Sequence, residues 1–328
     1  MATCKGLSLM SGGLDSQLAI RVLQRAGAEV EAVSFSTPFF DISAAKKAAD
    51  ALGVKLHVID FTDDEIALIE NPPHGFGGAM NPCIDCHALM IRRAGELMAK
   101  LGYDFVATGE VQGQRPMSQN KQSLGVVEKC SGLKGRLVRP MSAKLLEPTI
   151  PEQEGKLDRE KLLDISGRAR DRQIALAAEF GIVDYPSPAG GCKLTEEGFC
   201  RKLKDLQDHE GLGDRRLIEL LHVGRRFRLP DGSSVALGRD RDENAVLRTE
   251  ERGVCLAPVN VPGPTALIPD LKSDADLGLA AELVCSYSKY DRLEGDIRLV
   301  IRRADGTSDE RAVMRPYDRE KFKSWQIV

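Results

Sequence analysis

Short apolar runs and stretches with helical apolar spacing alternate along the first third of the chain. The apolar runs, which are typical of buried strands, lie at residues 6–10, 30–35, 55–59 and 105–109. The stretches with helical spacing lie between them, at residues 17–23, 43–52 and 86–101. Because strands that alternate with helices usually pair in parallel, the pattern predicts an α/β fold, with helices on both faces of a parallel sheet.

The pattern changes further along the chain. Residues 113–151 are rich in Gly, Pro, Ser and Lys, which predicts a loop-rich region with one or two short strands. Helical spacing returns at residues 159–180 and 195–221, and a Pro- and Gly-rich break separates them at residues 185–191. From residue 222 onward, short β-like runs and turns predict a smaller α+β domain.

Length and composition set the class of the protein. A chain of 328 residues with 42% hydrophobic and 29% charged residues is long enough for two folded domains and does not have a disordered composition. We place these domains at residues 1–200 and 201–328. The net charge of -3, from 46 basic and 49 acidic residues, gives no hint of nucleic acid, so any anion site must be local.

Two further features bear on location and redox state. No apolar window approaches the roughly 18 residues of a membrane helix, and the first residues lack a secretory signal, so we expect a cytoplasmic protein without a membrane partner. Eight cysteines are too few for a disulfide scaffold, and we expect most of them to be reduced thiols.

The segment between the first predicted strand and the first predicted helix reads Ser-Gly-Gly-Leu-Asp-Ser. Gly12 and Gly13 let backbone N–H groups converge, Ser11 and Ser16 add hydroxyl donors, and the helix start favours an anion. This arrangement predicts a phosphate site. It lacks the lysine of the GxxxxGK[ST] loop, so backbone and hydroxyl groups would hold the phosphates. Asp15 cannot attract phosphate, and we expect it to hold Mg²⁺ or to fix the loop.

Three cysteines form a second candidate site. Cys83 and Cys86 lie three positions apart at a predicted helix start, where the helix dipole favours thiolate. Cys192 lies in a turn-rich segment suited to presenting a side chain in a cleft. Three thiols favour an iron–sulfur cluster with one open iron, and a persulfide with a resolving thiol is the alternative. Zinc also stays open, although His87 adjoins Cys86 and is poorly placed as a fourth ligand.

The densest basic patch of the chain holds five arginines and one acid: Arg215, Arg216, Arg225, Arg226 and Arg228, with Glu219. Together with Arg239, these side chains would contact phosphate groups and so position an RNA without reading its sequence. An ordinary small domain with a polar rim is the alternative interpretation.

The Ser-Gly-Gly-Leu-Asp-Ser segment resembles the PP-loop of the N-type ATP pyrophosphatases, enzymes that adenylate a carbonyl oxygen and release pyrophosphate. The resemblance implies the adenine nucleotide alpha hydrolase-like fold, with ATP and Mg²⁺ as cofactors. It also implies that the backbone near Phe35 holds the adenine and that Thr108 and Gly109 lie by the nucleotide. The acceptor, which in such enzymes is a tRNA uridine, a carboxylate or a nitrogenous acid, is not specified by this motif.

The segment Asn-Pro-Cys-x-x-Cys-His, with the later Gly-Tyr-Asp-Phe-Val-Ala-Thr-Gly, resembles the tRNA 2-thiouridine synthases and the cluster-dependent tRNA 4-thiouridine synthases. The resemblance implies that Cys83, Cys86 and Cys192 handle sulfur. The 2-thiouridine group has Thr-Gly-His where this chain has Glu110 in the third position, which favours 4-thiouridine. We therefore predict a tRNA sulfurtransferase that adenylates a uridine carbonyl and replaces its oxygen with sulfur, using a 4Fe-4S cluster on the three cysteines.

The basic patch and the Gly-Arg and Glu-Asn pairs at residues 238–244 resemble the RNA-binding NFACT-R domain, which implies that residues 201–328 bind tRNA. We expect the sulfur donor to be sulfide or a cysteine desulfurase, and the sequence leaves a homodimer open. Three alternatives also stay open: a 2-thiouridine synthase that uses a persulfide, a PP-loop enzyme that acts on a small molecule, and a noncatalytic RNA-binding protein.

Overall fold

The computed structural model describes residues 4–115, 117–187, 191–291 and 293–328. The chain divides into two compact units, Met1–Thr195 and Glu196–Val328, so the division falls shortly before the predicted boundary at residue 200. Within the described ranges, none of the helices combines the length and the apolar character that crossing a membrane requires.

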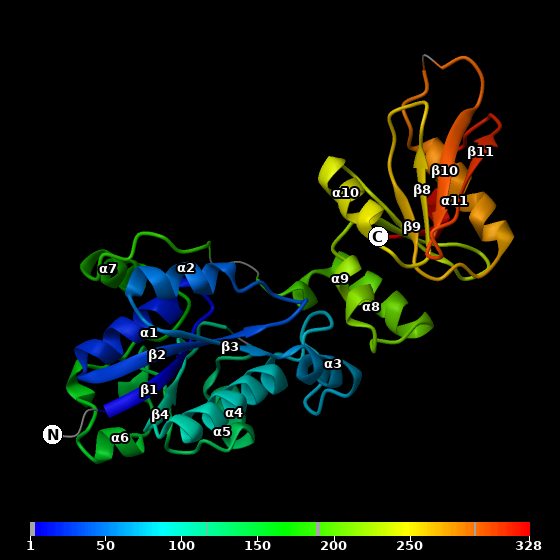
Figure 1. The fold of residues 1–328 in the computed structure, drawn as a ribbon. Helices are drawn as coiled ribbons and strands as arrows, with labels where there is room; N and C mark the ends of the chain where they lie inside the picture. The colour runs from blue at the N-terminus through cyan, green and yellow to red at the C-terminus, as the bar shows by residue number, and fades with distance from the viewer. Residues whose placement is uncertain (1–3, 116, 188–190, 292) are drawn as a thin grey trace. The chain divides into compact units, whose positions relative to one another are not determined.

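The first unit is built on a parallel sheet with the strand order β3-β2-β1-β4-β5 (Figure 1). Its strands are β1 (Cys4–Leu9), β2 (Ala28–Ser36), β3 (Leu56–Asp60), β4 (Phe105–Ala107) and β5 (Leu137–Val138). The chain runs outward from β1 to β3 and then returns to the other side of β1. The order therefore reverses between β1 and β4, the place at which open α/β sheets bind their ligands beyond the carboxyl ends of the strands.

Helices cover both faces of this sheet, which confirms the predicted fold class (Figure 1). The helices that pack on one face are α1 (Leu14–Arg25), α2 (Ser43–Leu52) and α7 (Asp171–Glu179). Those that pack on the other are α3 (Thr62–Glu70), α4 (Cys83–Leu101) and α5 (Lys121–Ser131). A short helix, α6 (Ile150–Gln153), follows β5. Neighbouring residues of β2, such as Ala32 and Val33, belong to opposite cores because strand side chains alternate between faces.

Two sequence-based predictions in this unit were wrong in detail. α5 lies in the region expected to be loop-rich; the Asn120 side chain caps it by accepting the Ser123 N–H, and Gly132 ends it in the left-handed conformation. The helix expected at residues 159–180 is two separate elements, a short 3-10 helix at Arg159–Lys161 and α7. Gly167, which has a φ of +83°, lies between them.

The second unit is an antiparallel sheet with the order β11-β10-β8-β9-β7-β6-β12, and helices cover both of its faces. Its strands are β6 (Arg225–Arg228), β7 (Ser234–Leu237), β8 (Val254–Pro258), β9 (Ala266–Ile268), β10 (Ile297–Arg303), β11 (Ser308–Val313) and β12 (Gln326–Ile327). α11 (Asp274–Ser286) packs on one face, and α9 (Arg215–Leu220) and α10 (Arg241–Thr249) pack on the other. α8 (Glu197–His209) precedes α9, so the helical stretch expected at residues 195–221 is two helices. The predicted α+β class is confirmed.

A buried glycine in the central strand gives a test of the first core. A Cβ atom on Gly6 would lie 2.3 Å from the ring of Phe105, which is fully buried. We expect Gly6→Ala to lower the stability by about 1–3 kcal/mol because the core cannot accept the extra volume. Thermal unfolding followed by circular dichroism measures this as a lower midpoint.

Gly125→Ala is the matched control, because Gly125 lies in α5 with no atom within 4 Å of its Cβ position. In an open helical site alanine is favoured over glycine by about 0.5–1 kcal/mol, so the midpoint should stay or rise. Equal unfolding midpoints for Gly6→Ala and Gly125→Ala would show that the core around Gly6 has room for a Cβ atom.

Candidate functional site

The loop predicted to bind phosphate connects β1 to α1 and packs against α2. Gly12 has a φ of +81°, and a Cβ atom there would lie 2.4 Å from the backbone of Ala44. The Ser16 hydroxyl donates to the Gly13 carbonyl oxygen at 2.8 Å, and the Gly13 N–H donates to the Ser11 hydroxyl at 3.3 Å. Only glycine at position 12 permits this close approach of the loop to α2.

The start of α1 keeps its capacity to bind an anion. Gly13 is the N-cap residue, and no side chain of the described residues caps this helix. The N–H groups of the first turn therefore point out of the helix at the positive end of its dipole. This geometry suits a phosphate, and the assignment of Ser11, Gly12, Gly13 and Ser16 to ATP stays a prediction.

The end of β4 lies directly against this loop. A Cβ atom on Gly109 would come within 2.7 Å of the backbone of Asp15 and Ser16, so glycine is required there. The neighbouring Thr108 is buried, and its hydroxyl donates to Glu110 Oε2 at 3.0 Å. The structure thus brings Gly109 to the predicted nucleotide loop and engages the Thr108 side chain with Glu110.

One carboxylate oxygen of Asp15 accepts a hydrogen bond, and the other has no described hydrogen-bond partner. Gln114 Nε2 donates to its Oδ2 at 2.8 Å, which brings Gln114 to the loop, as expected for a residue just past a strand end. Asp15 Oδ1 is buried and has no hydrogen-bond partner within the described ranges. Because Mg²⁺ prefers carboxylate oxygens, this orphaned atom beside an anion site fits a magnesium ligand.

The side chain of Phe35 lies in the core under α4 and meets Phe61 edge-on, with ring centroids 5.2 Å apart. It is therefore unavailable to a nucleotide, and only the backbone there could serve the adenine, as the resemblance implies.

The structure brings the three predicted cysteines into one neighbourhood. Cys83 begins α4, and Cys86 follows on the same side, one turn later. Asn81 Nδ2 donates to Cys83 Sγ at 3.1 Å. Cys192 is close enough to Cys86 for its charge to affect the Cys86 pKa. The N–H of the next residue, Lys193, donates to the carbonyl of Phe39 at 2.8 Å.

The surroundings of the Cys86 thiol are acidic. Cys86 Sγ donates to Glu65 Oε1 at 3.5 Å, and both side chains are buried. Burial raises the Cys86 pKa well above its ordinary value, and the charges of Glu65, Cys192 and Cys83 raise it further. Burial also raises the pKa of Glu65 to about 7. Over the described part of the chain, no three His, Cys, Asp or Glu side chains are arranged to hold a metal ion.

A buried carboxylate links the cysteine helix to the end of β4. Glu110 Oε2 accepts from Arg139 Nε at 2.8 Å, and Glu110 Oε1 lies 3.1 Å from His87 Nδ1. Burial alone would raise the pKa of Glu110, but the charge of Arg139 and the bonds from His87 and Arg139 lower it to about 2. His87 Nδ1 therefore faces Glu110.

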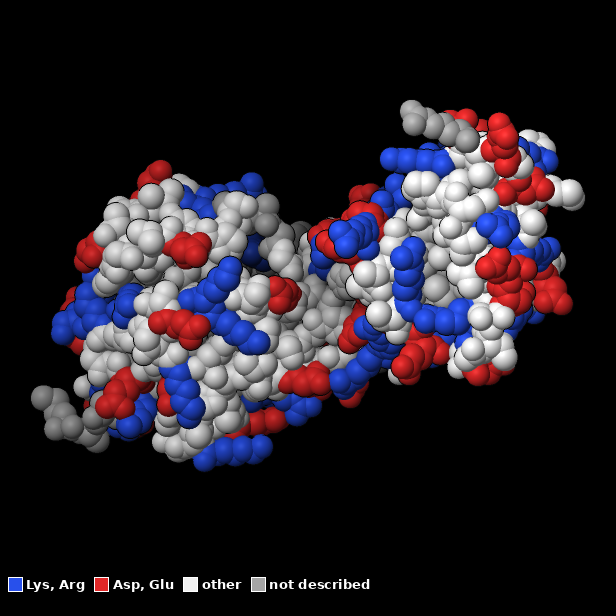
Figure 2. Space-filling model, turned by 45° about the horizontal axis from the view of Figure 1, so that its top comes forward, with Lys and Arg blue, Asp and Glu red and all other residues white. Residues whose placement is uncertain are grey.

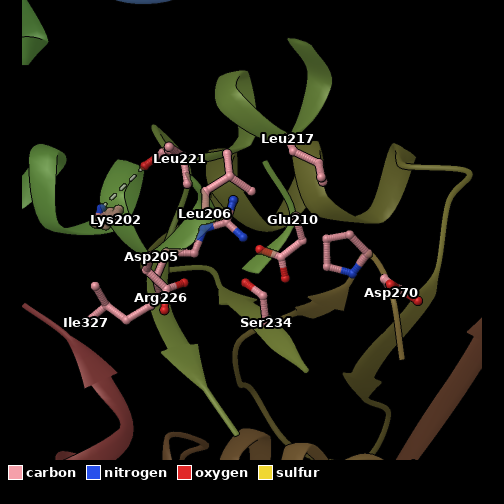
Figure 3. A pocket seen from close by; sticks show the side chains of 11 residues that line it. Lys202, Asp205, Leu206, Glu210, Leu217, Leu221, Arg226, Ser234, Asp270 and Ile327 are labelled. Atoms are coloured by element: carbon pink, nitrogen blue, oxygen red, sulfur yellow. Dashed lines mark hydrogen bonds between the residues drawn. The ribbon is translucent and has the colours of Figure 1, made fainter. Parts of the chain in front are cut away.

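Two of the arginines predicted to contact RNA are not on the surface. Arg226 is 3% exposed and lines a small cavity between α8, α9 and the sheet (Figure 3). Its Nε and Nη2 have no described partner, and burial lowers its pKa to about 10. Arg228 is held by Asp205 at 2.5 Å and Glu210 at 2.6 Å. The expected phosphate contacts of Arg226 and Arg228 do not agree with this burial and pairing.

The remaining predicted arginines differ in their surroundings. Arg216 pairs with Glu219 at 2.7 Å and also with Glu250, and Arg239 pairs with Glu243. Arg215 is exposed, and Arg225 lies over the ring of Tyr287 at 5.3 Å. Acidic and basic side chains are interspersed over the face shown in Figure 2, so carboxylates neutralise much of the patch that looked basic in the sequence.

Sequence reasoning missed two residues of this site. Glu65 belongs to no motif, and only the packing of α3 against α4 brings it to Cys86. Glu110 was visible only as a departure from Thr-Gly-His, and its role as the partner of Arg139 and His87 needs three separate elements of the fold.

Comparison with known families gives two matches on separate parts of the chain. Residues 2–144 match the family described as "Thiamine biosynthesis protein (ThiI)". Residues 224–326 match the "NFACT protein RNA binding domain".

Similar curated proteins match only part of this chain. A tRNA-specific 2-thiouridylase of Sulfurimonas denitrificans is 38% identical over 30% of this chain and 32% of its own. A probable tRNA sulfurtransferase of Thermoanaerobacter sp. (strain X514) is 35% identical over 37% of this chain and 33% of its own. The chain thus spans about a third of the length of these relatives.

A solved 4-thiouridine synthetase, bound to RNA and ATP, is 21% identical over 66% of this chain and 52% of its own, with a TM-score of 0.38 that is too low to indicate a common overall arrangement. The two sequence matches confirm the predicted resemblances: residues 2–144 are similar to the ThiI family, and residues 224–326 are similar to the NFACT-type RNA-binding domain.

Proposed function

We propose that this protein is an ATP-dependent tRNA sulfurtransferase that converts a uridine to 4-thiouridine. The observation that carries the proposal is the continuous contact from the predicted nucleotide loop to the thiols. Gly109 packs on the loop at Asp15, and the next residue, Glu110, binds His87, which adjoins Cys86. The predicted nucleotide loop and the helix that carries Cys83 and Cys86 are thus linked through two neighbouring residues at one strand end, Gly109 and Glu110.

In this proposal the first chemical step uses the loop. The N–H groups at the start of α1, with Ser11 and Ser16, hold the phosphates of ATP, and Asp15 Oδ1 ligates Mg²⁺. The uracil carbonyl oxygen attacks the α-phosphorus, and pyrophosphate leaves. A sulfur nucleophile then adds to the uracil carbon, and AMP leaves with the former carbonyl oxygen. The fixed phosphate groups lower the barrier because negative charge develops on the leaving groups, and Mg²⁺ held by Asp15 would supply further positive charge there.

We assign sulfur handling to Cys83, Cys86 and Cys192. Three cysteine thiols are the donor set of a 4Fe-4S cluster with one open iron, in which each sulfur would bind a different iron, and Cys83, Cys86 and Cys192 would hold such a cluster, whose open iron would supply a position for incoming sulfide. The chain itself would supply the three thiol ligands, and it buries Cys86 in contact with Glu65. Since the pKa of Glu65 is about 7, its carboxyl group is partly neutral near that pH, and it repels thiolate less than a charged acid would.

Other parts of the proposal rest on the two family matches. The match of residues 224–326 to an RNA-binding domain supports tRNA as the substrate. Because the proposed reaction transfers sulfur, we expect sulfide or a cysteine desulfurase to supply it. We place the enzyme in the cytoplasm, where tRNA is modified and thiols stay reduced.

The thiolation reaction tests the proposal. With tRNA, ATP, Mg²⁺ and sulfide under anaerobic conditions, mass spectrometry of digested tRNA should detect 4-thiouridine. Cys83→Ser, Cys86→Ser and Cys192→Ser should each lower its formation at least about 100-fold, because serine neither carries sulfur nor binds iron well. Cys255→Ser is the matched control, since Cys255 is buried in the second unit.

Iron analysis of the same anaerobic preparation separates the two sulfur routes. About four irons per chain, absent from the three serine variants, are expected for the cluster. An iron-free protein that thiolates tRNA with a cysteine desulfurase and cysteine, but not with sulfide, would favour a persulfide over the cluster, because a desulfurase delivers sulfur already at the oxidation level of a persulfide. A tRNA with an unchanged nucleoside profile would contradict the proposed reaction.

The contact between β4 and the loop gives a second test. We expect Gly109→Ala to raise the KM for ATP about tenfold or more, because its Cβ would displace the Asp15 backbone. The measurement is tRNA-dependent release of pyrophosphate, and Gly125→Ala serves as the control. An unchanged KM would show that ATP does not bind at this loop.

The link through Glu110 gives a third test. His87→Ala removes the hydrogen bond to Glu110 but leaves the pair of Glu110 and Arg139 intact. We expect thiolation to fall about tenfold or more while the KM for ATP stays unchanged, because the cysteine helix is no longer held in register with β4. His87→Gln, which can still donate to Glu110, should restore most of the rate; equally slow thiolation in both variants would contradict a positioning role.

A further inference from the structure

The unpaired cations of the second unit gather on two tyrosines. Arg225 and Arg319 lie over the ring of Tyr287, with guanidinium carbons 5.3 Å and 3.9 Å from its centroid. Arg315 lies 5.3 Å from the centroid of Tyr290. Within the residues that the structure describes, none of these three arginines forms an ion pair. We call Arg225, Tyr287, Tyr290, Arg315 and Arg319 the arginine–tyrosine surface.

The fold builds this surface from three segments that are far apart in the sequence, namely β6 with Arg225, the end of α11 with the residues after it, and residues 315–319. Tyr287 is the C-cap residue of α11, and Tyr290 follows it. Tyr317 lies between the two arginines of the third segment in sequence, and its ring meets that of Tyr290 edge-on at 4.9 Å. The Tyr317 hydroxyl donates to the Val313 carbonyl at 2.7 Å and accepts the Ile297 N–H at 2.8 Å, so the second and third segments are fixed.

The surface combines flat groups with uncompensated charge. Arg315, Arg319 and the neighbouring Lys289 are exposed, and the tyrosine rings are partly buried. Phe227 supports Tyr287 from the core, at 6.2 Å between centroids. A guanidinium plane over a supported ring is held in place and presents its other face to solvent, where a planar ligand can stack on it.

This surface differs from the patch that the sequence predicted. Arg216, Arg228 and Arg239 are neutralised by carboxylates of the same unit, and Arg226 is buried. A cation that is already paired adds little to phosphate binding, whereas an unpaired cation releases counterions when it binds a phosphate. Arg225 is the one predicted residue that also belongs to the arginine–tyrosine surface.

We propose that the arginine–tyrosine surface binds unpaired nucleotides of RNA, with bases stacked on its guanidinium and tyrosine planes and phosphates near Lys289. This inference rests on the RNA-binding role in the proposed function and adds the class of RNA and the mode of contact. Bases within a duplex are already stacked on one another, so such planes favour single-stranded segments, and duplex RNA would make only the phosphate contacts.

Fluorescence anisotropy with the full chain tests the inference, using a labelled 12-nucleotide oligouridine and a 12-base-pair RNA duplex. We expect Arg315→Gln/Arg319→Gln to weaken binding of the oligouridine at least tenfold. Arg315→Lys/Arg319→Lys keeps the charge and removes the planes, so it should weaken that binding at least threefold and leave the duplex unaffected. Circular dichroism melting checks that the variants are folded.

The matched control is Arg241→Gln/Arg311→Gln, which removes the same charge from two exposed arginines in α10 and β11. It should change oligouridine binding less than threefold. An equal weakening in the control and in the Arg315/Arg319 glutamine variant would overturn the inference, and so would tighter binding of the duplex than of oligouridine by the wild type.

The salt dependence separates stacking from charge. The slope of log K against log salt concentration should be unchanged in the lysine variant. In the glutamine variant it should be shallower by about 0.7 for each phosphate that the missing arginines had neutralised. A wild-type protein that thiolates tRNA, with variants that bind oligouridine normally, would contradict this inference alone. A wild-type protein that neither binds nor thiolates tRNA would contradict the proposed function itself.

Discussion

The buried carboxylate of Glu110 is the constraint on which the first unit depends. A charge without solvent is tolerated only when partners surround it, and here the partners come from three elements: Arg139 after β5, His87 on α4 and Thr108 at the end of β4. Without Arg139 the buried charge of Glu110 would be uncompensated, and displacement of α4 or of Thr108 would remove one of its hydrogen bonds. The end of the sheet and the start of the cysteine helix are thereby held as one piece.

This constraint extends to the nucleotide loop through a steric contact. Gly109 precedes Glu110 and touches the backbone of Asp15 and Ser16, with no room for a Cβ atom. The position of Glu110 therefore also sets the distance between β4 and the loop. The predicted nucleotide loop and the start of the cysteine helix are thus kept in register by the contacts of Glu110 and by one glycine.

Charge is organised differently in the second unit. Arg216, Arg228 and Arg239 contact carboxylates of the same unit, and such pairing leaves little of their charge available to a ligand. The cations over Tyr287 and Tyr290 have ring faces as partners instead. An aromatic partner holds a guanidinium in place without neutralising it, which leaves its charge available to an anion.

The alternation of apolar runs was enough to predict the parallel sheet, the helices on both faces and the α+β class of the second unit, because the burial of side chains on a strand or helix follows a local period. The loop of Ser11–Ser16 and the CxxC pair were also readable, since their geometry depends on adjacent residues. The helix at Lys121–Ser131 was not predicted, because its polar residues and its N-cap, Asn120, lie in a stretch whose composition is typical of a loop.

Only the tertiary structure decided that Glu65 meets Cys86 and that Glu110 binds Arg139. It also decided which arginines are paired, buried or stacked. Such contacts join residues far apart in the chain, and a charge count cannot tell an arginine that faces solvent from one that the fold has already paired.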